Sequence, residues 1–393
     1  MNRLVMYILA AFQLLGGGGS NTTEYWIFNL LLFVVYFGIF PFLYEYLQLM
    51  RFQMQINGFL QQLSATITNG ISQFLGAVNQ VMAKDGSTVD SDKVKNELRN
   101  LMDLVVIDPT NIETEGLVRK LKYLINMYSD RLEGDVKRMM PNLDKPMVQN
   151  MTNAVEVLRN LNYIYKVVDH YYKLSSKYKS YYLLYQLTFM LPFLKEAVNA
   201  LSGSITSFVK GQPIGDAAGP LTIYRFMNNS CQGKASMDSV VPDTYIGQCI
   251  YNQRKIYLVK AQGPGGTVGH LDDAVNYLLE TINLKPRLVI TIDAALKLEG
   301  EKTGTITDGL GVAMGGIGAE KFNIETTVSR HNIPLYAILI KMSEAEALNT
   351  MTKQIDDAVN SAIDRLRKII DTYTSPGDEV LVIGVGNTIG VAQ

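Results

Sequence analysis

The sequence predicts a transmembrane helix near the N-terminus, an all-α middle region and a C-terminal α/β domain with a mostly parallel sheet. Three observations support this: a long uncharged apolar segment, a glycine-poor stretch with helical spacing, and a glycine-rich end where strand-like runs alternate with amphipathic helices. We place a signal-like segment and anchor at residues 1–50, a helical stalk or collar at 51–205, and the α/β domain at 206–393.

The composition limits the classes of function that the chain can have before any motif is considered. The chain has 393 residues and a formal net charge of −1, so two or three domains fit and no global field favours nucleic acid. Cys231 and Cys249 are too few for a disulfide framework; they can pair, and the sequence leaves their redox state open. No Cys/His cluster has zinc spacing, so we assign no metal, and the cofactor is unknown.

The anchor is "YWIFNLLLFVVYFGIFPFLYEYLQLM", residues 25–50. It has no charge between Trp26 and Tyr44, which is about the length that spans a bilayer, and a buried soluble helix is the alternative. The preceding apolar run is signal-like or a short first span, so the anchor is a single pass or a hairpin. Arg51 follows the anchor, whereas residues 16–25, with a linker-like glycine run and a sequon at Asn21, lack Lys and Arg. We therefore expect a cell-membrane protein with its bulk in the cytoplasm.

The middle region has apolar residues three and four apart, as in "LVRKLKYLINMY" and "AVEVLRNLNYIYKVV". A tyrosine-dense stretch follows, which at helical spacing is better explained by core packing than by an aromatic binding surface. We expect "YYLLYQLTFMLPFL", residues 181–194, to be buried and not to span the membrane, because it is short and contains Pro192.

The last part of the chain alternates predicted strands and helices. The strands are "KIYLVKA", "RLVITIDAAL", "IPLYAILIKM" and "EVLVIGVG"; the helices are "HLDDAVNYLLETI" and "EALNTMTKQIDDAVNSAIDRLRKIIDTY". This order predicts a sheet with helices on its faces, and sites in such sheets form at the carboxyl ends of the strands.

Glycine-rich loops at the strand ends are candidate ligand sites. In "YLVKAQGPGGTVGHLDDAV" a loop precedes a helix, so its N–H groups could hold a phosphate, although the P-loop pattern is missing. The terminal "GVGNTIG" also misses the dinucleotide fingerprint, and glycines needed only for turns are the alternative at each loop. The candidate ligand-binding residues are Gly263, Gly265, Gly266, Thr267, Gly384, Gly386 and Asn387.

Two aspartates are the candidate catalytic residues. Asp216 lies in "PIGDAAGPL", and Asp293 ends the apolar run "VITID". If their carboxylates face each other, they must share a proton, which leaves an acid–base pair able to activate water. The alternative for Asp293 is an N-cap or turn acceptor for a helix formed by "AALKLEG".

The C-terminal half also resembles a known superfamily. "PIGDAAGPL" followed by "VITIDAALKLEGEKTGTITDGLGVAMGGIGAEK" resembles the germination proteases and hydrogenase-maturation proteases. The resemblance implies a hydrolase-like sheet and a catalytic pair at Asp216 and Asp293. His331 and His270 are only loosely placed for the nickel-binding histidine of the maturation proteases. Lys260, Lys297 and Glu299 are candidate neighbours of the site, or part of a solvated face.

In those families the first strand, similar to "VLVIGVGNT", runs directly into the GD-x-x-GP loop and its helix. Here the strand-like half is at the C-terminus and the loop opens the domain, which predicts a circular permutation. The helix expected after the glycine loop is then residues 221–228. This hypothesis requires the loop 384–388 to lie against Asp216.

The whole chain resembles an archaeal family of membrane proteins of unknown function, through "KAQGPGGTVG", "IDAALKLEGEKTG" and "VGVGNTIG". Three functions follow from the sequence. The first is an aspartate-dependent hydrolase acting on peptides; the second is a sensor of a nucleotide or phosphate ligand; the third is a membrane-anchored scaffold. The expected partners are the membrane and further copies of the chain, and nucleic acid is not expected.

Overall fold

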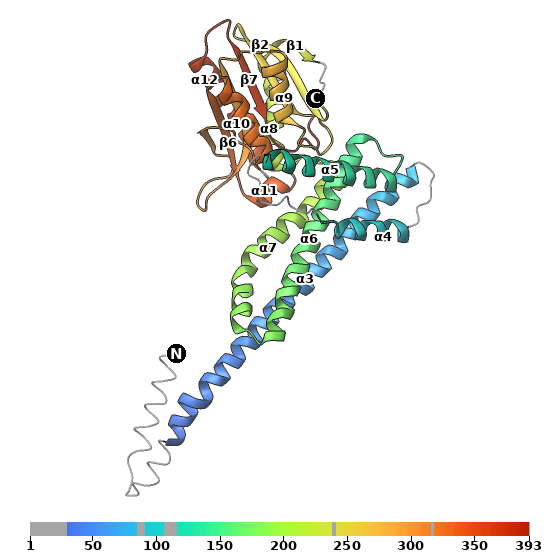
Figure 1. The fold of residues 1–393 in the computed structure, drawn as a ribbon, viewed down its shortest axis with the longest axis vertical. Helices are drawn as coiled ribbons and strands as arrows, with labels where there is room; N and C mark the ends of the chain where they lie inside the picture. The colour runs from blue at the N-terminus through green and yellow to red at the C-terminus, as the bar shows by residue number, and fades with distance from the viewer. Residues whose placement is uncertain (1–29, 85–90, 106–115, 238–240, 316–317, 393) are drawn as a thin grey trace. The chain divides into compact units, whose positions relative to one another are not determined.

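The computed structural model describes residues 30–84, 91–105, 116–237, 241–315 and 318–392 (Figure 1). The predicted signal-like segment, glycine run and sequon lie outside these residues. The chain divides into two compact units: one comprises the described residues up to Gly58 together with Tyr171–Phe189, and the other comprises Phe59–His170 and Met190–Gln393. Each unit is described by itself.

The larger unit contains a seven-stranded sheet in the order β1-β2-β3-β7-β4-β6-β5. Its strands are β1 (Gln232–Met237), β2 (Thr244–Tyr251), β3 (Arg254–Ala261), β4 (Leu288–Leu296), β5 (Ile306–Leu310), β6 (Leu335–Met342) and β7 (Glu379–Gly384). The four central strands, β3, β7, β4 and β6, are parallel, whereas β1, β2 and β5 pair antiparallel at the two edges.

The sheet is therefore mixed, and the prediction of a mostly parallel sheet describes only its centre. The sequence reading missed the three edge strands. The tight turn at Asn252 and Gln253, with φ of 45° and 61°, forces β2 and β3 to run antiparallel. Two consecutive residues with positive φ are typical of a two-residue hairpin turn.

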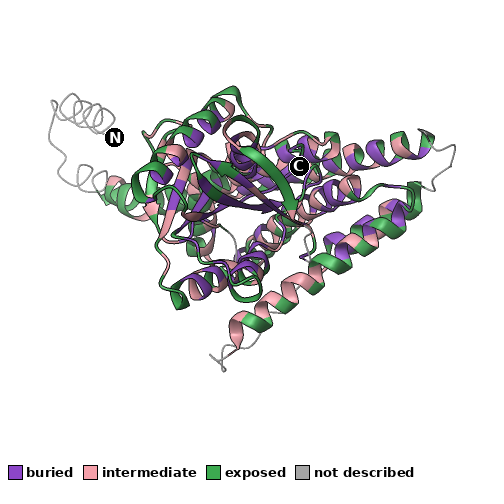
Figure 2. Ribbon diagram, turned by 90° about the horizontal axis from the view of Figure 1, so that it is seen from above, coloured by how far each residue is buried: buried purple, intermediate pink, exposed green. Residues whose placement is uncertain are grey.

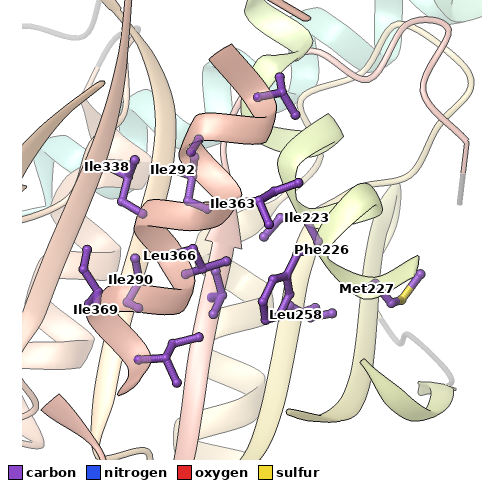
Figure 3. Close-up of a cluster of buried hydrophobic side chains, with 14 of the residues drawn as sticks. Ile223, Phe226, Met227, Leu258, Ile290, Ile292, Ile338, Ile363, Leu366 and Ile369 are labelled. Atoms are coloured by element: carbon purple, nitrogen blue, oxygen red, sulfur yellow. The ribbon is translucent and has the colours of Figure 1, made fainter. Parts of the chain in front are cut away.

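Helices cover both faces of the sheet. On one face α8 (Ala218–Ser230) and α12 (Lys353–Tyr373) pack on the strands. Figure 3 shows Ile290 and Ile292 of β4 beside Ile363 and Leu366 of α12. On the other face lie α9 (Leu271–Asn276), which continues as the π-helical η3 (Tyr277–Thr281), and α10 (Ala319–Arg330). Strands covered on both sides carry continuous apolar runs, and Figure 2 shows the central strands in the colour of buried residues.

The predicted strands correspond to β3, β4, β6 and β7, but the last predicted helix is divided. It forms α11 (Glu344–Leu348) and then α12, with a break in which Met351 N donates to the carbonyl of Pro213 (2.7 Å). The Ser343 hydroxyl caps α11, and the Thr352 hydroxyl caps α12. The two cysteines, Cys231 and Cys249, form a disulfide in the structure, with Cα atoms 5.6 Å apart.

The helical part consists of α3 (Phe40–Lys84), α4 (Ser91–Met102), α5 (Leu117–Met139), α6 (Lys145–Tyr178) and α7 (Tyr181–Lys210). Within the larger unit, α6 and α7 are hydrogen-bonded to the α/β part. Asn153 Nδ2 donates to the carbonyl of Gly266 (2.6 Å), and the hydroxyls of Ser207 and Thr350 are 2.8 Å apart. The helices therefore hold loops of the α/β part in place.

The smaller unit combines the N-terminal part of α3 with the turn between α6 and α7. The helix Leu30–Ala83, which includes the π-helical η1 (Val34–Ile39), is long and apolar enough to cross a membrane, and none of its most apolar 18-residue window is buried. The prediction that residues 181–194 are buried is wrong: Tyr182 is 66% exposed and Phe189 is 64% exposed. Among the described residues of this unit, α3 packs against the turn and most of the turn's aromatic side chains stay exposed. In addition, α7 continues through Pro192.

Candidate functional site

A cavity of about 360 Å³ lies at the carboxyl ends of β4 and β7. This is where ligands bind in sheets with parallel central strands. The cavity is lined by Ile125, Asp216, Val268, Leu271, Asp293, Ala294, Met314, Gly315, Gly318, Ala319, Glu320, Val385 and Gly386. Both predicted catalytic aspartates therefore open into one cavity, and its remaining walls are mostly apolar.

Asp293 is a buried residue of β4, with 5% of its surface exposed. Burial, and after it the charge of Asp216, raise its pKa to about 8, although N–H donors from Ala294 and Gly315 oppose the shift. Its Oδ2 accepts the hydrogen bond from Gly315 N (3.2 Å). Since β4 continues to Leu296, no helix begins after Asp293 and the helix-cap alternative is wrong.

Asp216 lies in a single 3₁₀ turn, η2 (Gly215–Ala217), directly before α8. Burial raises the pKa of its carboxyl, and the N–H of Asn387 opposes this by donating to Oδ2 (2.7 Å). The position before a helix N-terminus also favours the ionised form. The charge of Asp216 is one of the causes that raise the pKa of Asp293, so ionisation of one carboxyl disfavours ionisation of the other.

Three glycines allow the strand ends and α8 to meet at this point. A Cβ on Gly386, whose φ is 131°, would lie 2.0 Å from the carbonyl oxygen of Asp216. A Cβ on Gly219 would lie 2.2 Å from the carbonyl oxygen of Val385, and one on Gly384 would lie 2.5 Å from a side-chain carbon of Ile223. The loop 384–388 therefore lies against Asp216, as the permutation hypothesis requires, and the expected helix 221–228 is part of α8.

The predicted loop 263–269 is held differently. Gly266 N donates to Asn150 Oδ1 (2.8 Å), and a Cβ on Gly265 would lie 2.0 Å from Gln149 Oε1. The carbonyl of Thr267 accepts from Thr388 N (2.9 Å). Of this loop only Val268 lines the cavity, so Gly263, Gly265, Gly266 and Thr267 lie against α6 and the C-terminal loop.

The other polar residues named from the sequence do not line the cavity. Lys260 is fully buried; its Nζ donates to the carbonyls of Ala261 (3.2 Å) and Ala392 (3.1 Å), and burial lowers its pKa to about 8. Lys297 donates to Thr303 Oγ1 (3.1 Å), and Glu299 is exposed.

The two histidines are also outside the cavity lining. His331 Nε2 lies 3.2 Å from Glu280 Oε1, and His270 is the residue before α9. In the part of the chain that the structure describes, no group of three or more His, Cys, Asp or Glu side chains is arranged to hold a metal ion.

Sequence reasoning missed a third carboxyl group, Glu320 in the first turn of α10. It lines the cavity, and burial raises its pKa to about 7, with the charge of Asp272 adding to the shift and that of Lys122 opposing it. An acidic residue in the first helical turn is common, so nothing in the local sequence marked Glu320 as part of a site.

Sequence reasoning also missed an ion-pair cluster that holds α5 beside the cavity. Lys122 Nζ contacts Asp272 Oδ2 and Asp273 Oδ1, each at 2.7 Å, and the Asp272 side chain is 1% exposed. Burial lowers the pKa of Lys122, but the hydrogen bonds to the two aspartates outweigh this and raise it. Ile125, one helical turn further on, contributes to the cavity wall, so the helical region helps to form the site.

Two family models match the chain. Residues 30–211 match the N-terminal domain of a protein of unknown function, DUF1512, and residues 214–392 match the C-terminal domain of the same family. No curated protein matches the chain.

Replacing Lys122 with methionine should destabilise the larger unit by about 3 kcal/mol, because the buried carboxylate of Asp272 loses its cation and keeps only the hydrogen bond from Asn323. Arg119→Met, at an exposed position of the same helix, is the control and should change stability by less than about 0.5 kcal/mol. Denaturant unfolding of the full chain in detergent measures both variants. Equal effects would contradict a structural role for the ion-pair cluster.

Asp293→Asn should make stability less dependent on pH. A carboxyl whose pKa rises from 3.8 unfolded to about 8 folded binds its proton more tightly in the folded state, so it reduces stability as pH rises through this window. As pH rises through this window, the free energy of unfolding of the variant should increase relative to that of wild type by up to ~1.4 kcal/mol per pH unit. Thermal unfolding at pH 5 and pH 8 tests this, with Asp364→Asn, whose side chain is 74% exposed, as the control. A difference from wild type that is the same at both pH values would refute the assignment.

Proposed function

The chain belongs to the DUF1512 family, and from that premise we propose that it is a membrane-anchored, aspartate-dependent hydrolase that cleaves amide bonds in peptides. The observation that carries the proposal is the pair Asp216 and Asp293 in one cavity, with the pKa of Asp293 raised to about 8. Titratable groups held in such different environments are typical of an acid and a base working together.

In the proposed reaction, Asp216 is the base and Asp293 is the acid. Asp216 takes a proton from a water molecule, whose oxygen forms a bond to the carbonyl carbon of the substrate. Asp293 gives its proton to the carbonyl oxygen, so that the tetrahedral intermediate is neutral. The C–N bond then breaks: the leaving nitrogen takes the proton held by Asp216, and the hydroxyl of the intermediate returns its proton to Asp293.

The cavity supports a substrate with apolar groups next to the scissile bond. Ile125, Leu271 and Met314 form its apolar walls, and Glu320 is the one carboxyl besides the catalytic pair in the lining that the structure describes. Binding of side chains on these walls would keep the amide carbon near the two aspartates, which lowers the entropic part of the barrier.

The rival functions have less support. A phosphate sensor needs backbone N–H groups that point at a ligand, but the Gly266 N–H is already bonded to Asn150. A scaffold is expected to have closed loops, and residues 263–267 form one. It has no need, however, of a cavity in which one carboxyl raises the pKa of another. The resemblance to germination proteases supports the hydrolase.

The location proposed for the enzyme follows from the apolar helix. The apolar helix can supply the span, and Arg51 after its apolar part supports a cytoplasmic position for the remaining chain. The resemblance to archaeal membrane proteins supports this arrangement. Assembly into a homo-oligomer is part of the proposal.

Asp216→Asn and Asp293→Asn should each lower peptide cleavage by about 10³-fold, because each removes one proton-transfer group. The measurement uses the full chain in detergent, a proteome-derived peptide library, and mass spectrometry of the new termini. Asp364→Asn is the matched control, since it changes an exposed aspartate on α12. Cleavage by wild type that is no greater than cleavage by the two variants would disprove the proposal.

The rate should fall above about pH 8, where Asp293 loses its proton, and again in acid, where Asp216 gains one. The measurement is kcat/KM between pH 4 and pH 10 on a cleaved peptide identified from the library. Because Glu320 also has a raised pKa, Glu320→Gln serves as the control and should keep the alkaline fall. A rate that stays constant up to pH 10 would show that no protonated Asp293 is needed.

A further inference from the structure

The cavity contains one carboxyl that the proposed reaction does not use, Glu320. We propose that Glu320 binds the α-ammonium group at the free amino terminus of a peptide, so that the enzyme cleaves an amide bond close to that end. The substrate class is then peptides with an unblocked amino terminus. This inference rests on the proposed hydrolase reaction and adds to it the part of the substrate that the cavity recognises.

The carboxyl of Glu320 lacks a partner of its own. It is half-buried in the first turn of α10 and forms no hydrogen bond or ion pair with another residue that the structure describes. Lys122 acts on it only from a distance, since its Nζ contacts Asp272 and Asp273, each at 2.7 Å. Burial, and after it the charge of Asp272, raise the pKa of Glu320 to about 7. A ligand that brings a positive charge would stabilise the ionised form.

The ionisable groups of the cavity lining are all acidic. They are Glu320, Asp216 and Asp293, and no Lys, Arg or His is among the described residues of the lining. If Asp293 holds a proton, ionisation of the other two still leaves negative charge between largely apolar walls. A cationic ligand lowers this electrostatic free energy, whereas an acidic ligand raises it. The cavity therefore favours a substrate with a positive group.

An amine fits this cavity better than a metal ion does. In the described part of the chain, no three His, Cys, Asp or Glu side chains are arranged to hold a metal. An ammonium group donates three hydrogen bonds and needs no fixed set of ligands, so a single carboxylate can be its main partner. The carbon atoms attached to the amine would contact the apolar walls at Ile125 and Leu271.

The size of the cavity favours the end of a peptide over an internal segment. Its volume of about 360 Å³ is near the lower limit of small-molecule sites, about 300 Å³, so it holds a short segment. At an amino terminus the ammonium nitrogen and the first carbonyl carbon are separated by only two bonds of about 1.5 Å each. One cavity can therefore hold both the ammonium group at Glu320 and an amide near the two aspartates.

The position of Glu320 is fixed by the packing of α10. Asn323, one helical turn later, donates to Asp272 Oδ2 (2.7 Å), the oxygen that Lys122 also contacts. The helices α10 and α5 are in contact, and Figure 1 shows them next to each other. A carboxylate on a helix held in this way loses little conformational freedom when it binds a ligand, which favours recognition.

Cleavage and binding of a matched set of peptides test the inference. The set is a short apolar peptide that begins with leucine, the same peptide acetylated at its amino terminus, and the acetylated peptide with one internal lysine. Cleavage is measured as kcat/KM of the full chain in detergent, and mass spectrometry identifies the bond. Binding is measured by calorimetry on Asp216→Asn, which the proposed reaction makes inactive, and on the same variant combined with Glu320→Gln.

We expect acetylation to lower kcat/KM of wild type about 100-fold, because the carboxylate of Glu320 then stays in the cavity without a cation. Glu320→Gln should cleave the free and the acetylated peptide at similar rates, since its amide carries no charge. Glu344→Gln changes an exposed glutamate in the first turn of α11, so it is the control and should keep the ratio of wild type.

The outcomes separate this inference from the proposed hydrolase. If wild type cleaves the free and acetylated peptides equally, or Glu320→Gln keeps their ratio, recognition of the amino terminus is refuted and the hydrolase stands. Recovery of cleavage by the internal lysine would refute it too, because Glu320 would then bind a basic side chain. If wild type cleaves none of the peptides, the hydrolase loses support and calorimetry decides: affinity for the free peptide that acetylation and Glu320→Gln both weaken supports the amine site, and equal affinities refute it.

Discussion

The insertion of the last strand into the middle of the sheet is the constraint on which the remaining structure depends. β7 pairs with β3 on one side and with β4 on the other, so the two halves of the sheet meet only through the C-terminal strand. Its loop then closes on the first turn of the domain, where Asn387 N donates to Asp216 Oδ2 (2.7 Å). The two ends of the α/β region thus form one structural unit, which is why glycine is needed at Gly386 and Gly219, where any side chain would meet backbone.

The same closure concentrates unfavourable charge in one place. Burial of Asp216 and Asp293 beside each other disfavours ionisation of both. Among the described residues, backbone N–H donors oppose this effect, two at Asp293 and one at Asp216, and no basic side chain does. A basic partner would lower both pKa values and make the two carboxyls alike. Because no cation offsets the burial of the two carboxyls, one of them stays protonated near neutral pH. The large apolar core on both faces of the sheet stabilises the fold despite this local strain.

Much of this arrangement could be predicted from local patterns, and the remainder depends on contacts between distant segments. Continuous apolar runs identified β4, β6 and β7. The spacing of Asp216 and Asp293 left their pairing open, and the pair was predicted from the resemblance to the germination proteases. The role of the loop 263–269 was not predictable, since Gly266 is held by Asn150, more than a hundred residues earlier. Glu320 enters the cavity only through the packing of α10, and the exposure of Tyr182 depends on which helix faces the turn between α6 and α7. None of these contacts leaves a periodic signal in the sequence.

The helical region is also more than a spacer between the anchor and the sheet. Ile125 of α5 forms part of the cavity wall, and Lys122 neutralises Asp272, whose other carboxylate oxygen is buried without a hydrogen-bond partner. Asn150 and Asn153 of α6 hold Gly266 from both its N–H and its carbonyl. A Cβ on Gly265 would lie 2.0 Å from a side chain of α6, and a Cβ on Gly266 would lie 2.3 Å from another. The conformation of the loop therefore depends on its contact with α6. An α/β region separated from these helices would expose the loop and leave the Asp272 carboxylate without its cation, and therefore the site belongs to both regions together.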